Sequence, residues 1–247
     1  MKLTIVGCGD AFGSGGRLQT CYHLEIAGRG VLIDCGASAL IGLNRLVLAP
    51  NDIDTVFITH LHGDHFAGLV WLIMHAQHVG RRTAPLTIVG PSGIEDRYMA
   101  AAEALFPGST EMDLGFALQF VAYDADDSLT IGPASVSVRE VSHPSGAPSY
   151  ALRLEAEGRV LAFSGDTEWV DALVDVAAGA DLFIIECYGF DADVRYHMNW
   201  RIIERNLDRL VAQRVMLTHM NSHMLANRAA VQSPRVLLAE DGLVLDV

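Results

Sequence analysis

One seven-residue segment constrains this chain more than any other feature: Thr-His-Leu-His-Gly-Asp-His at residues 59–65. It places three imidazoles and one carboxylate within six positions, from His60 to His65. Neutral imidazole is the most common protein ligand for zinc-like ions, and aspartate adds a harder oxygen donor. The competing interpretation is a polar turn that is rich in histidine by chance, and four potential ligands in six positions argue against it. The segment therefore predicts a metal site.

The residues on either side place this segment on a strand-to-helix turn. Residues 55–59 form a short β-branched and apolar run, which indicates a buried strand. Residues 66–78 are mostly apolar and contain no Gly or Pro after Gly68, which indicates a helix. Turns of this kind carry the ligand-binding loops of α/β proteins.

Strand-like and helix-like segments alternate along the whole chain. The expected strands are 2–6, 22–27, 31–34, 55–59, 85–90, 116–122, 129–131, 134–141, 150–156, 160–164, 182–186 and, as the last core strand, 215–218. The expected helices are 37–48, 66–78, 94–105, 168–178 and 199–213. No linker, repeat or low-complexity segment divides the chain. We therefore expect a single domain, residues 1–247, built from two similar α/β halves.

Composition and charge exclude several classes of protein. Hydrophobic residues make up 51% and charged residues 19%, which is typical of a globular enzyme and not of a disordered chain. The formal net charge of −13 argues against a protein that holds polyanions by bulk electrostatics. The four cysteines form no CxxC pair, so we expect reduced thiols. With no basic leader and no long apolar run, the sequence predicts a cytoplasmic protein without membrane attachment.

A glycine-rich segment lies between the first two expected strands. Residues 7–16 read Gly-Cys-Gly-Asp-Ala-Phe-Gly-Ser-Gly-Gly, which suggests a dinucleotide-binding loop. The spacing is GxGxxxG and no helix follows before Tyr22, so this match is weak. A loop that lets the backbone come close to a substrate or metal site is the better interpretation.

Three more metal-competent side chains follow expected strands. His143 follows residues 134–141, Asp166 follows 160–164, and His219 follows 215–218. A single histidine after a strand is usually only a polar loop residue. Three such positions, added to residues 60–65, indicate that these side chains converge at one edge of the sheets.

These motifs resemble those of the metallo-β-lactamase fold superfamily, and the resemblance covers essentially the full length. It implies a four-layer αβ/βα sandwich and a binuclear metal-dependent hydrolase. It also implies that one ion is bound by His60, His62 and His143 and the second by Asp64, His65 and His219, with Asp166 bridging both. Zinc is the expected metal for such a set, and manganese or iron is also compatible with mixed nitrogen and oxygen ligands.

Within this superfamily the chain is most similar to the phosphodiesterase branch, which includes the ribonuclease Z-like enzymes. The similarity is carried by residues 90–94, residues 164–167 and His197, which lies twenty-two positions before His219. In that branch a histidine at this place contacts the scissile phosphate or assists the leaving group. The branch's usual His-Ser-Thr is here His-Met-Asn, so the flanking hydroxyls do not carry over. A surface-loop histidine is the competing interpretation of His197, and homodimerisation is implied by the resemblance alone.

The substrate class follows from a departure from this branch. The tRNA-processing members with a long flexible arm carry it between the third metal histidine and the bridging aspartate. Here His143 and Asp166 are 23 positions apart, and expected strands fill most of the interval. Together with the acidic net charge, this argues against a long structured RNA and favours a small-molecule substrate, a cyclic or linear phosphodiester.

The expected chemistry is hydrolysis by a hydroxide that bridges the two ions. By resemblance Asp64 also orients or deprotonates the nucleophile, and His197 is a candidate general acid for the leaving alkoxide. The alternatives are a tRNA 3′-processing endonuclease-like activity, hydrolysis of a thioester or lactam, and a non-catalytic ligand-binding member of the fold. The complete ligand set argues against the last of these.

Some other polar residues have more ordinary expected roles. Asp34 is expected to accept a hydrogen bond from a ligand histidine, because such ligands usually need an orienting partner. His75 and His78 are expected to be structural or exposed, because they lie beyond the first turns of the helix. His23 is expected to be satisfied or solvent-facing on its strand, and for His223 a position lining the site and a loop position remain open.

Overall fold

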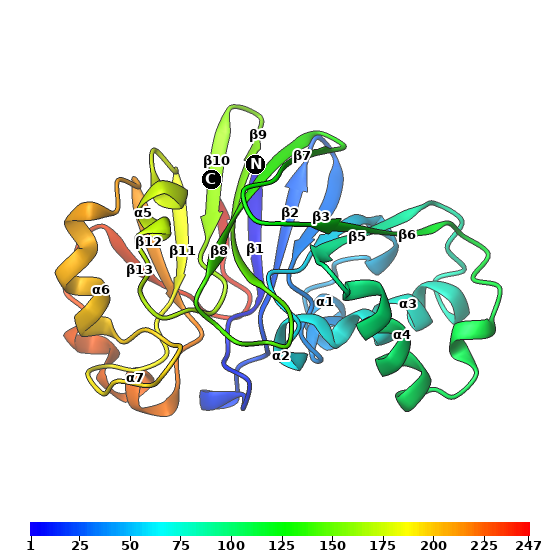
Figure 1. Cartoon of the computed structure of the whole chain (residues 1–247), viewed down its shortest axis with the longest axis horizontal. Coiled ribbons are helices and arrows are strands. Elements are labelled where there is room, and N and C mark those ends of the chain that lie inside the picture. The colour runs from blue at the N-terminus through cyan, green and yellow to red at the C-terminus, as the bar shows by residue number, and fades with distance from the viewer.

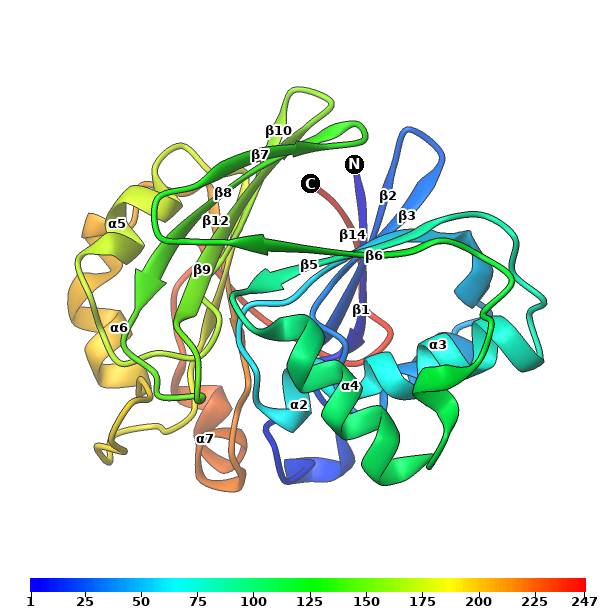
Figure 2. The same ribbon diagram turned by 45° about the vertical axis from the view of Figure 1, so that its right-hand side comes forward.

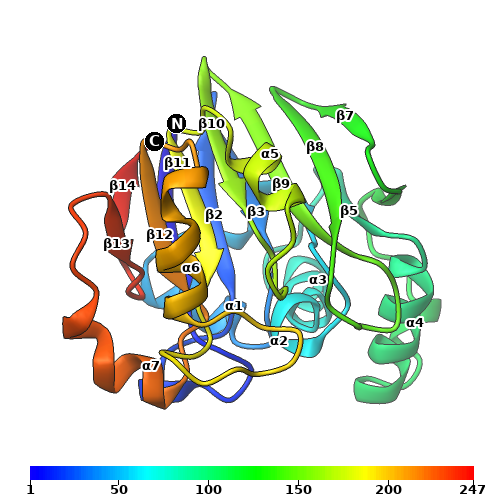
Figure 3. The ribbon, with the colours of Figure 1, turned by 60° about the vertical axis from the view of Figure 1, so that its left-hand side comes forward.

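Two seven-stranded β-sheets lie face to face, and helices cover the outer face of each (Figure 1; Figure 2). The computed structural model describes all residues, 1–247. From one side of the molecule, helices of the second half cover their sheet while those of the first half lie behind (Figure 3). The four-layer αβ/βα sandwich predicted from the sequence is confirmed.

Each sheet takes nearly all of its strands from one half of the chain. The first sheet contains β1 (Lys2–Gly7), β2 (Cys21–Ile26), β3 (Arg29–Ile33), β4 (Ile53–Phe57), β5 (Leu86–Pro91), β6 (Leu118–Tyr123) and β14 (Val244–Asp246). The second contains β7 (Ser128–Ile131), β8 (Ala134–Val141), β9 (Ser149–Ala156), β10 (Arg159–Phe163), β11 (Leu182–Glu186), β12 (Arg214–Thr218) and β13 (Val236–Leu238). The helices are α1 (Ala39–Arg45), α2 (Gly63–Phe66), α3 (Gly68–His78), α4 (Ile94–Leu105), α5 (Ala172–Ala177), α6 (Trp200–Asn206) and α7 (Ser222–Asn227).

Both sheets are mixed, and their parallel parts carry the functional loops. The strand order is β14-β1-β2-β3-β4-β5-β6 in the first sheet and β13-β12-β11-β10-β9-β8-β7 in the second. Strands β3 to β6 are parallel neighbours, and so are β10 to β13. Because the carboxyl ends of parallel strands meet at one edge of a sheet, the loops after β10 and β12 leave the second sheet at the same edge, on either side of β11.

Three apolar layers hold the sandwich together. One layer fills the space between the sheets, and the other two lie between each sheet and its helices. Strand β11 shows the pattern, because Ile184 packs between the sheets while Ile185 packs against the helices. Across the central layer the rings of Tyr22 and Phe163 meet edge to face at 5.1 Å. The Tyr22 hydroxyl also lies 2.7 Å from the Thr218 hydroxyl, so a buried hydrogen bond links β2 to β12.

The helices of the second half are shorter than predicted from the sequence, and the last two strands were not predicted. The helix predicted over 168–178 begins only at Ala172, and the one predicted over 199–213 ends at Asn206 and a short 3-10 turn. Residues 210–213 are not helical, since the Val211 carbonyl and the Gln213 N–H form hydrogen bonds to residues 179 and 180. The segment 215–218 is the last buried strand, as predicted, but two short edge strands follow it, since β13 pairs with β12 and β14 pairs with β1.

The longest helix, α4, has 12 residues, and no helix has both the length and the apolar character needed to cross a membrane.

Candidate metal centre

All seven predicted ligands lie at one edge of the sandwich, where strands end and loops begin. His60 and His62 lie in the loop after β4, and Asp64 and His65 lie on α2. His143 follows β8, Asp166 follows β10, and His219 follows β12. The structure therefore brings together residues that are up to 159 positions apart (60 to 219), and six of the seven are buried.

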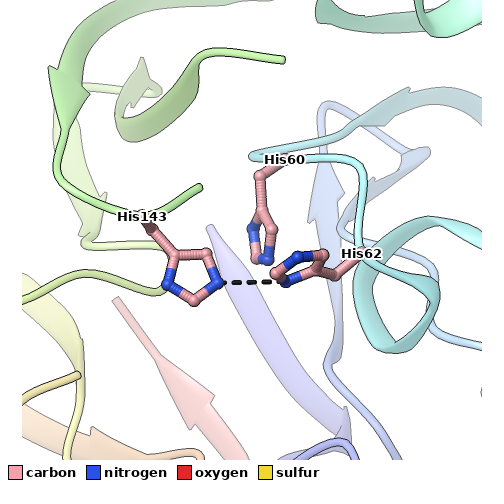
Figure 4. A group of neighbouring side chains, drawn as sticks. All are labelled: His60, His62 and His143. Carbon is pink, nitrogen blue, oxygen red and sulfur yellow. Dashed lines mark hydrogen bonds between the residues drawn. The ribbon is translucent and has the colours of Figure 1, made fainter. Parts of the chain in front are cut away.

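The first group consists of His60, His62 and His143, whose ring nitrogens lie within 4.8 Å of one another. The three rings point toward a common centre from two separate loops (Figure 4). His143 Nε2 lies 3.0 Å from His62 Nδ1. Since His143 Nδ1 donates to the Tyr196 carbonyl at 3.0 Å, Nε2 of the neutral ring presents a lone pair to His62. A proton or a cation must lie between these two nitrogens.

The second group consists of Asp64, His65, Asp166 and His219, whose ligand atoms also lie within 4.8 Å of one another. His219 Nε2 is 3.1 Å from Asp64 Oδ2 and 3.2 Å from Asp166 Oδ2. His65 Nε2 is 3.4 Å and 3.3 Å from the same two oxygens. The second group is therefore a compact set of two imidazoles and two carboxylates.

Asp166 lies between the two groups. Its Oδ2 is 4.0 Å from His60 Nε2 in the first group, and it contacts both histidines of the second. Its Oδ1, together with His60 Nε2 and His65 Nε2, is buried without a hydrogen-bond partner. Buried polar atoms are almost always paired, so such unpaired atoms at one point need an explanation. Two divalent cations would satisfy them, and the donor set suits zinc and also accepts manganese or iron.

Asp34 orients histidines of both groups from behind, which confirms the role expected from the sequence. Its Oδ2 accepts a hydrogen bond from His65 Nδ1 at 2.6 Å and one from the Thr59 hydroxyl at 2.9 Å. The Thr59 hydroxyl lies 3.0 Å from His60 Nδ1 and can accept its proton. Because their Nδ1 atoms form these hydrogen bonds, the Nε2 atoms of His60 and His65 remain available to bind an ion.

Burial and charge set different protonation states in the two groups. Burial lowers the pKa of His60 well below its usual value and that of His143 to about 4, so these rings are neutral. Burial also lowers the pKa of His219, but the charge of Asp166 and the hydrogen bond to Asp64 together outweigh it and raise the pKa to about 9. When no cation is bound, the proton in the second group is therefore carried by its histidines and faces its ionised carboxylates. A cation would displace this proton.

Residues 7–18 support His219 from the N-terminal half. The His219 N–H donates to the Cys8 carbonyl at 3.0 Å, and the Gly9 N–H donates to the Leu18 carbonyl at 2.7 Å. Added Cβ atoms at Gly7 and Gly9 would collide with the backbone at residues 17–19. The close approach that these glycines allow is to residues 17–19, and close approach of the loop to a substrate or metal stays a prediction.

His197 lies beside both groups and has a partner that the sequence reasoning missed. Its Nδ1 is 3.1 Å from Oε2 of Glu186, the last residue of β11, which is fully buried. Burial lowers the pKa of His197, but the hydrogen bond to Glu186 and the charges of Glu186 and Asp166 together outweigh it and raise the pKa above its usual value. Glu186 also accepts a hydrogen bond from the Thr167 N–H, next to Asp166. Its position as a carboxylate at the end of an apolar strand is the sequence feature that could have identified Glu186.

The remaining histidines lie outside the two groups. His75 is half-buried and His78 exposed on α3, as predicted. His23 is half-buried on β2. His223 is exposed, 3.9 Å from Asp191, and lies on helix α7 and not in a loop.

Comparisons with known proteins agree with this architecture. The probable metallo-hydrolase YhfI of Bacillus subtilis is 25% identical over 226 residues, which cover 89% of this chain and 87% of YhfI. The crystal structure of YhfI superposes with a TM-score of 0.81 and covers 99% of this chain and 98% of that one. Ribonuclease Z of Clostridioides difficile is 27% identical over 300 aligned positions, covering 99% and 98% of the two chains.

A third relative is human tRNase Z, short form. Its crystal structure is 26% identical to this chain, with a TM-score of 0.79 and coverage of 100% and 99%. The family described as "Anti-Pycsar protein Apyc1" matches residues 1–242. The chain therefore belongs to this family and is a metal-dependent hydrolase of the metallo-β-lactamase fold, similar to the ribonuclease Z enzymes.

Proposed function

We propose that this hydrolase is a binuclear phosphodiesterase that acts on a small cyclic or linear phosphodiester. The observation that carries the proposal is the pair of Glu186 and His197 beside the two ligand groups. Ligand atoms of His197, His143 and Asp166 lie within 4.8 Å of one another. An alkoxide leaving group needs a proton, whereas a thiolate, with a pKa near that of cysteine, leaves without one. A positioned acid beside the centre therefore favours phosphodiesters over thioesters.

The chain's own residues divide the work of this reaction. His60, His62 and His143 would hold one ion and Asp64, His65 and His219 the other, with Asp166 between them. When bound, the ions lower the pKa of water and stabilise charge on the phosphoryl oxygens. Burial raises the pKa of Asp64, but the charge of His65 and the hydrogen bonds from His219 and His65 together outweigh it and hold the pKa well below its usual range. Asp64 is thus ionised and can accept a hydrogen bond that orients the attacking water.

His197 acts at the opposite end of the reaction. With Nδ1 donating to Glu186, its Nε2 is the nitrogen that can give a proton to the departing oxygen. Glu186 is held by the Thr167 N–H on one oxygen and by His197 on the other. The carboxylate therefore orients the imidazole and stabilises its charged form.

The proposal of a small substrate has separate support. Strands β9 and β10 occupy most of the interval between His143 and Asp166, so no arm extends from it. The net charge of −13 opposes the approach of a long polyanion. A tRNA precursor is therefore the weaker candidate.

A substrate panel tests the reaction class. Protein loaded with zinc or manganese is assayed with bis(p-nitrophenyl) phosphate, an acyl thioester and nitrocefin. We expect turnover of the phosphodiester. Turnover of the thioester or nitrocefin without phosphodiester cleavage would contradict the proposal, and efficient cleavage of a tRNA precursor alone would contradict the small substrate.

The His197→Ala variant tests the acid. We expect it to keep its metal and to lose about 10²- to 10⁴-fold in turnover of an alkyl ester, much less with p-nitrophenolate as leaving group. His78→Ala, an exposed histidine on α3, is the matched control. Equal losses for both leaving groups would exclude the acid role.

A further inference from the structure

We propose that Tyr188 is a positioning residue that holds the His197 imidazole in its proton-donating orientation. Tyr188 lies two residues after Glu186, just past the end of β11. Its ring is stacked on that of His197, with centroids 4.7 Å apart and planes 28° apart. Its centroid is also 6.0 Å from that of His219. This inference rests on the phosphodiesterase function proposed above, because it assigns a residue that acts through His197.

His197 needs such support because its own attachment is weak. It lies on the loop between β11 and α6 and is half-buried, and its backbone N–H is bonded only within that loop, to the Val194 carbonyl at 3.1 Å. The side chain has one hydrogen bond, from Nδ1 to Glu186. One hydrogen bond fixes one atom of the ring and leaves the plane free to turn about that contact.

The backbone next to His197 is strained. Tyr196 has a φ of +66°, a left-handed conformation that is costly for a bulky side chain. It is stabilised there by the hydrogen bond from His143 Nδ1 to its carbonyl. A strained residue persists only where the surroundings fix it, so the position of His197 depends on further contacts.

Three rings supply these contacts. Tyr188 covers one face of the imidazole, and His143 approaches it edge-on, with centroids 4.9 Å apart and planes 68° apart. The His219 ring is nearly parallel to it, with centroids 5.8 Å apart and planes 12° apart. His143 and His219 are themselves proposed ligands. Tyr188 is therefore the contact that defines the plane of His197 without itself offering an atom to an ion.

Tyr188 is fixed by the sheet. The Cys187 N–H donates to the Thr218 carbonyl at 2.9 Å and so extends the pairing of β11 with β12. The Asn221 N–H donates to the Tyr188 carbonyl at 2.9 Å. The ring thus stands on backbone held at both sides, and it can impose an orientation on a residue of the neighbouring loop.

The experiment compares Tyr188→Leu and Tyr188→Phe with the wild-type holoenzyme and with His197→Ala. Each is assayed with an alkyl phosphodiester and with bis(p-nitrophenyl) phosphate. For Tyr188→Leu we expect kcat on the alkyl ester to fall about 10- to 100-fold, the effect of a small displacement of a catalytic group. KM, metal content and turnover of the nitrophenyl ester should change little. Tyr188→Phe keeps the ring and should stay within about threefold of wild type.

A second readout does not depend on activity. The Nδ1 proton of His197, assigned by its absence in His197→Ala, should be protected from exchange in wild type and Tyr188→Phe and exchange faster in Tyr188→Leu. Trp71→Leu replaces a half-buried aromatic ring on α3 and serves as the control for general loss of packing. It should leave both the leaving-group dependence and this proton unchanged.

The outcomes separate this inference from the proposed function. If His197→Ala shows the leaving-group dependence and Tyr188→Leu does not, the positioning role is wrong and the phosphodiesterase proposal stands. If neither shows it, the acid role of His197 is wrong. An equal loss in Tyr188→Phe and Tyr188→Leu would contradict stacking by the ring, and loss of metal in Tyr188→Leu would show that Tyr188 supports His219 instead.

Discussion

Asp34 is linked to both proposed ligand groups, directly to His65 and through Thr59 to His60, without offering an atom to either ion. It accepts hydrogen bonds from His65 and from Thr59, and Thr59 contacts His60. In Asp34→Asn one carboxylate oxygen becomes an NH₂ group, so either His65 Nδ1 or the Thr59 N–H, which donates to Oδ1 at 2.8 Å, faces a donor in place of an acceptor. Either His65 or the segment that carries His60 then loses its orientation. We expect metal affinity to fall about 10- to 100-fold while the fold is retained. Competition with a chromogenic chelator measures this.

The matched control for Asp34→Asn is Asp208→Asn, an exposed aspartate after α6. Circular dichroism separates loss of metal from loss of fold. Unchanged affinity in folded Asp34→Asn would mean that the histidines are oriented by packing alone.

Asp166 is the residue on which both proposed sites depend. Its Oδ2 lies 3.3 Å from His65 Nε2 and 4.0 Å from His60 Nε2, so its removal takes an oxygen from both groups. We expect Asp166→Ala to bind fewer than two ions per chain, and both less tightly. Elemental analysis after dialysis checks this. Two ions retained per chain would contradict the bridging position.

The residues of the centre differ in how far the sequence could reveal them. His60 to His65 form a local pattern, so their spacing alone indicated a metal. His143, Asp166 and His219 were recognised by their place after strands and by resemblance, and the structure brings all of them to one edge. Glu186 was missed because a single carboxylate at a strand end has no local pattern. Its pairing with His197 forms only when a loop folds back over the sheet.

At the scale of elements, close packing of α3 depends on a glycine. An added Cβ at Gly68 would collide with the carbonyl oxygen of Gly36, which is backbone and cannot move away. At Gly63, on α2, the nearest atom to such a Cβ is 3.8 Å away, on Ala67. Both glycines lie in helices, where alanine is intrinsically favoured by up to about 1 kcal/mol.

The two substitutions should therefore change the free energy of unfolding in opposite directions. We expect Gly68→Ala to lower the free energy of unfolding by about 1–3 kcal/mol, the usual effect of overpacking. Gly63→Ala should leave it unchanged or raise it by up to about 1 kcal/mol. Urea denaturation of both variants under identical metal conditions measures the difference. Equal free energies of unfolding for the two variants would show that α3 can shift without loss of stability.

Elements were predictable where local pattern and tertiary context agree. The bounds of β8, β11 and α4 match the prediction, because each is an uninterrupted run with a clear period or a clear apolar stretch. The ends of α5 and α6 were wrong, since hydrogen bonds to distant loops override helix propensity there. Strands β13 and β14 have three residues each, too few for a period to be visible.

For the whole molecule, the two halves share a core and a metal site. The central apolar layer contains 25 buried residues drawn from both sheets. The proposed ligands also come from both, with His60 to His65 on loops of the first sheet and His143, Asp166 and His219 on loops of the second. Neither half can lose its structure without exposing the other half's face of this layer. The single domain predicted from the sequence therefore implies cooperative unfolding.

Thermal unfolding of metal-loaded and chelator-treated protein tests this directly. We expect one transition in both states, with the same midpoint by circular dichroism and by tryptophan fluorescence. Because an ion held by loops of both sheets binds the folded chain, its removal should lower the midpoint. The stabilisation lost is about 2.7 kcal/mol if the ion had been present at a hundred times its dissociation constant.

In Asp166→Ala, which lacks the shared oxygen, the chelator should shift the midpoint much less than in wild type. Two separate transitions would show that the halves unfold independently. A chelator shift as large in Asp166→Ala as in wild type would show that the ions bind elsewhere.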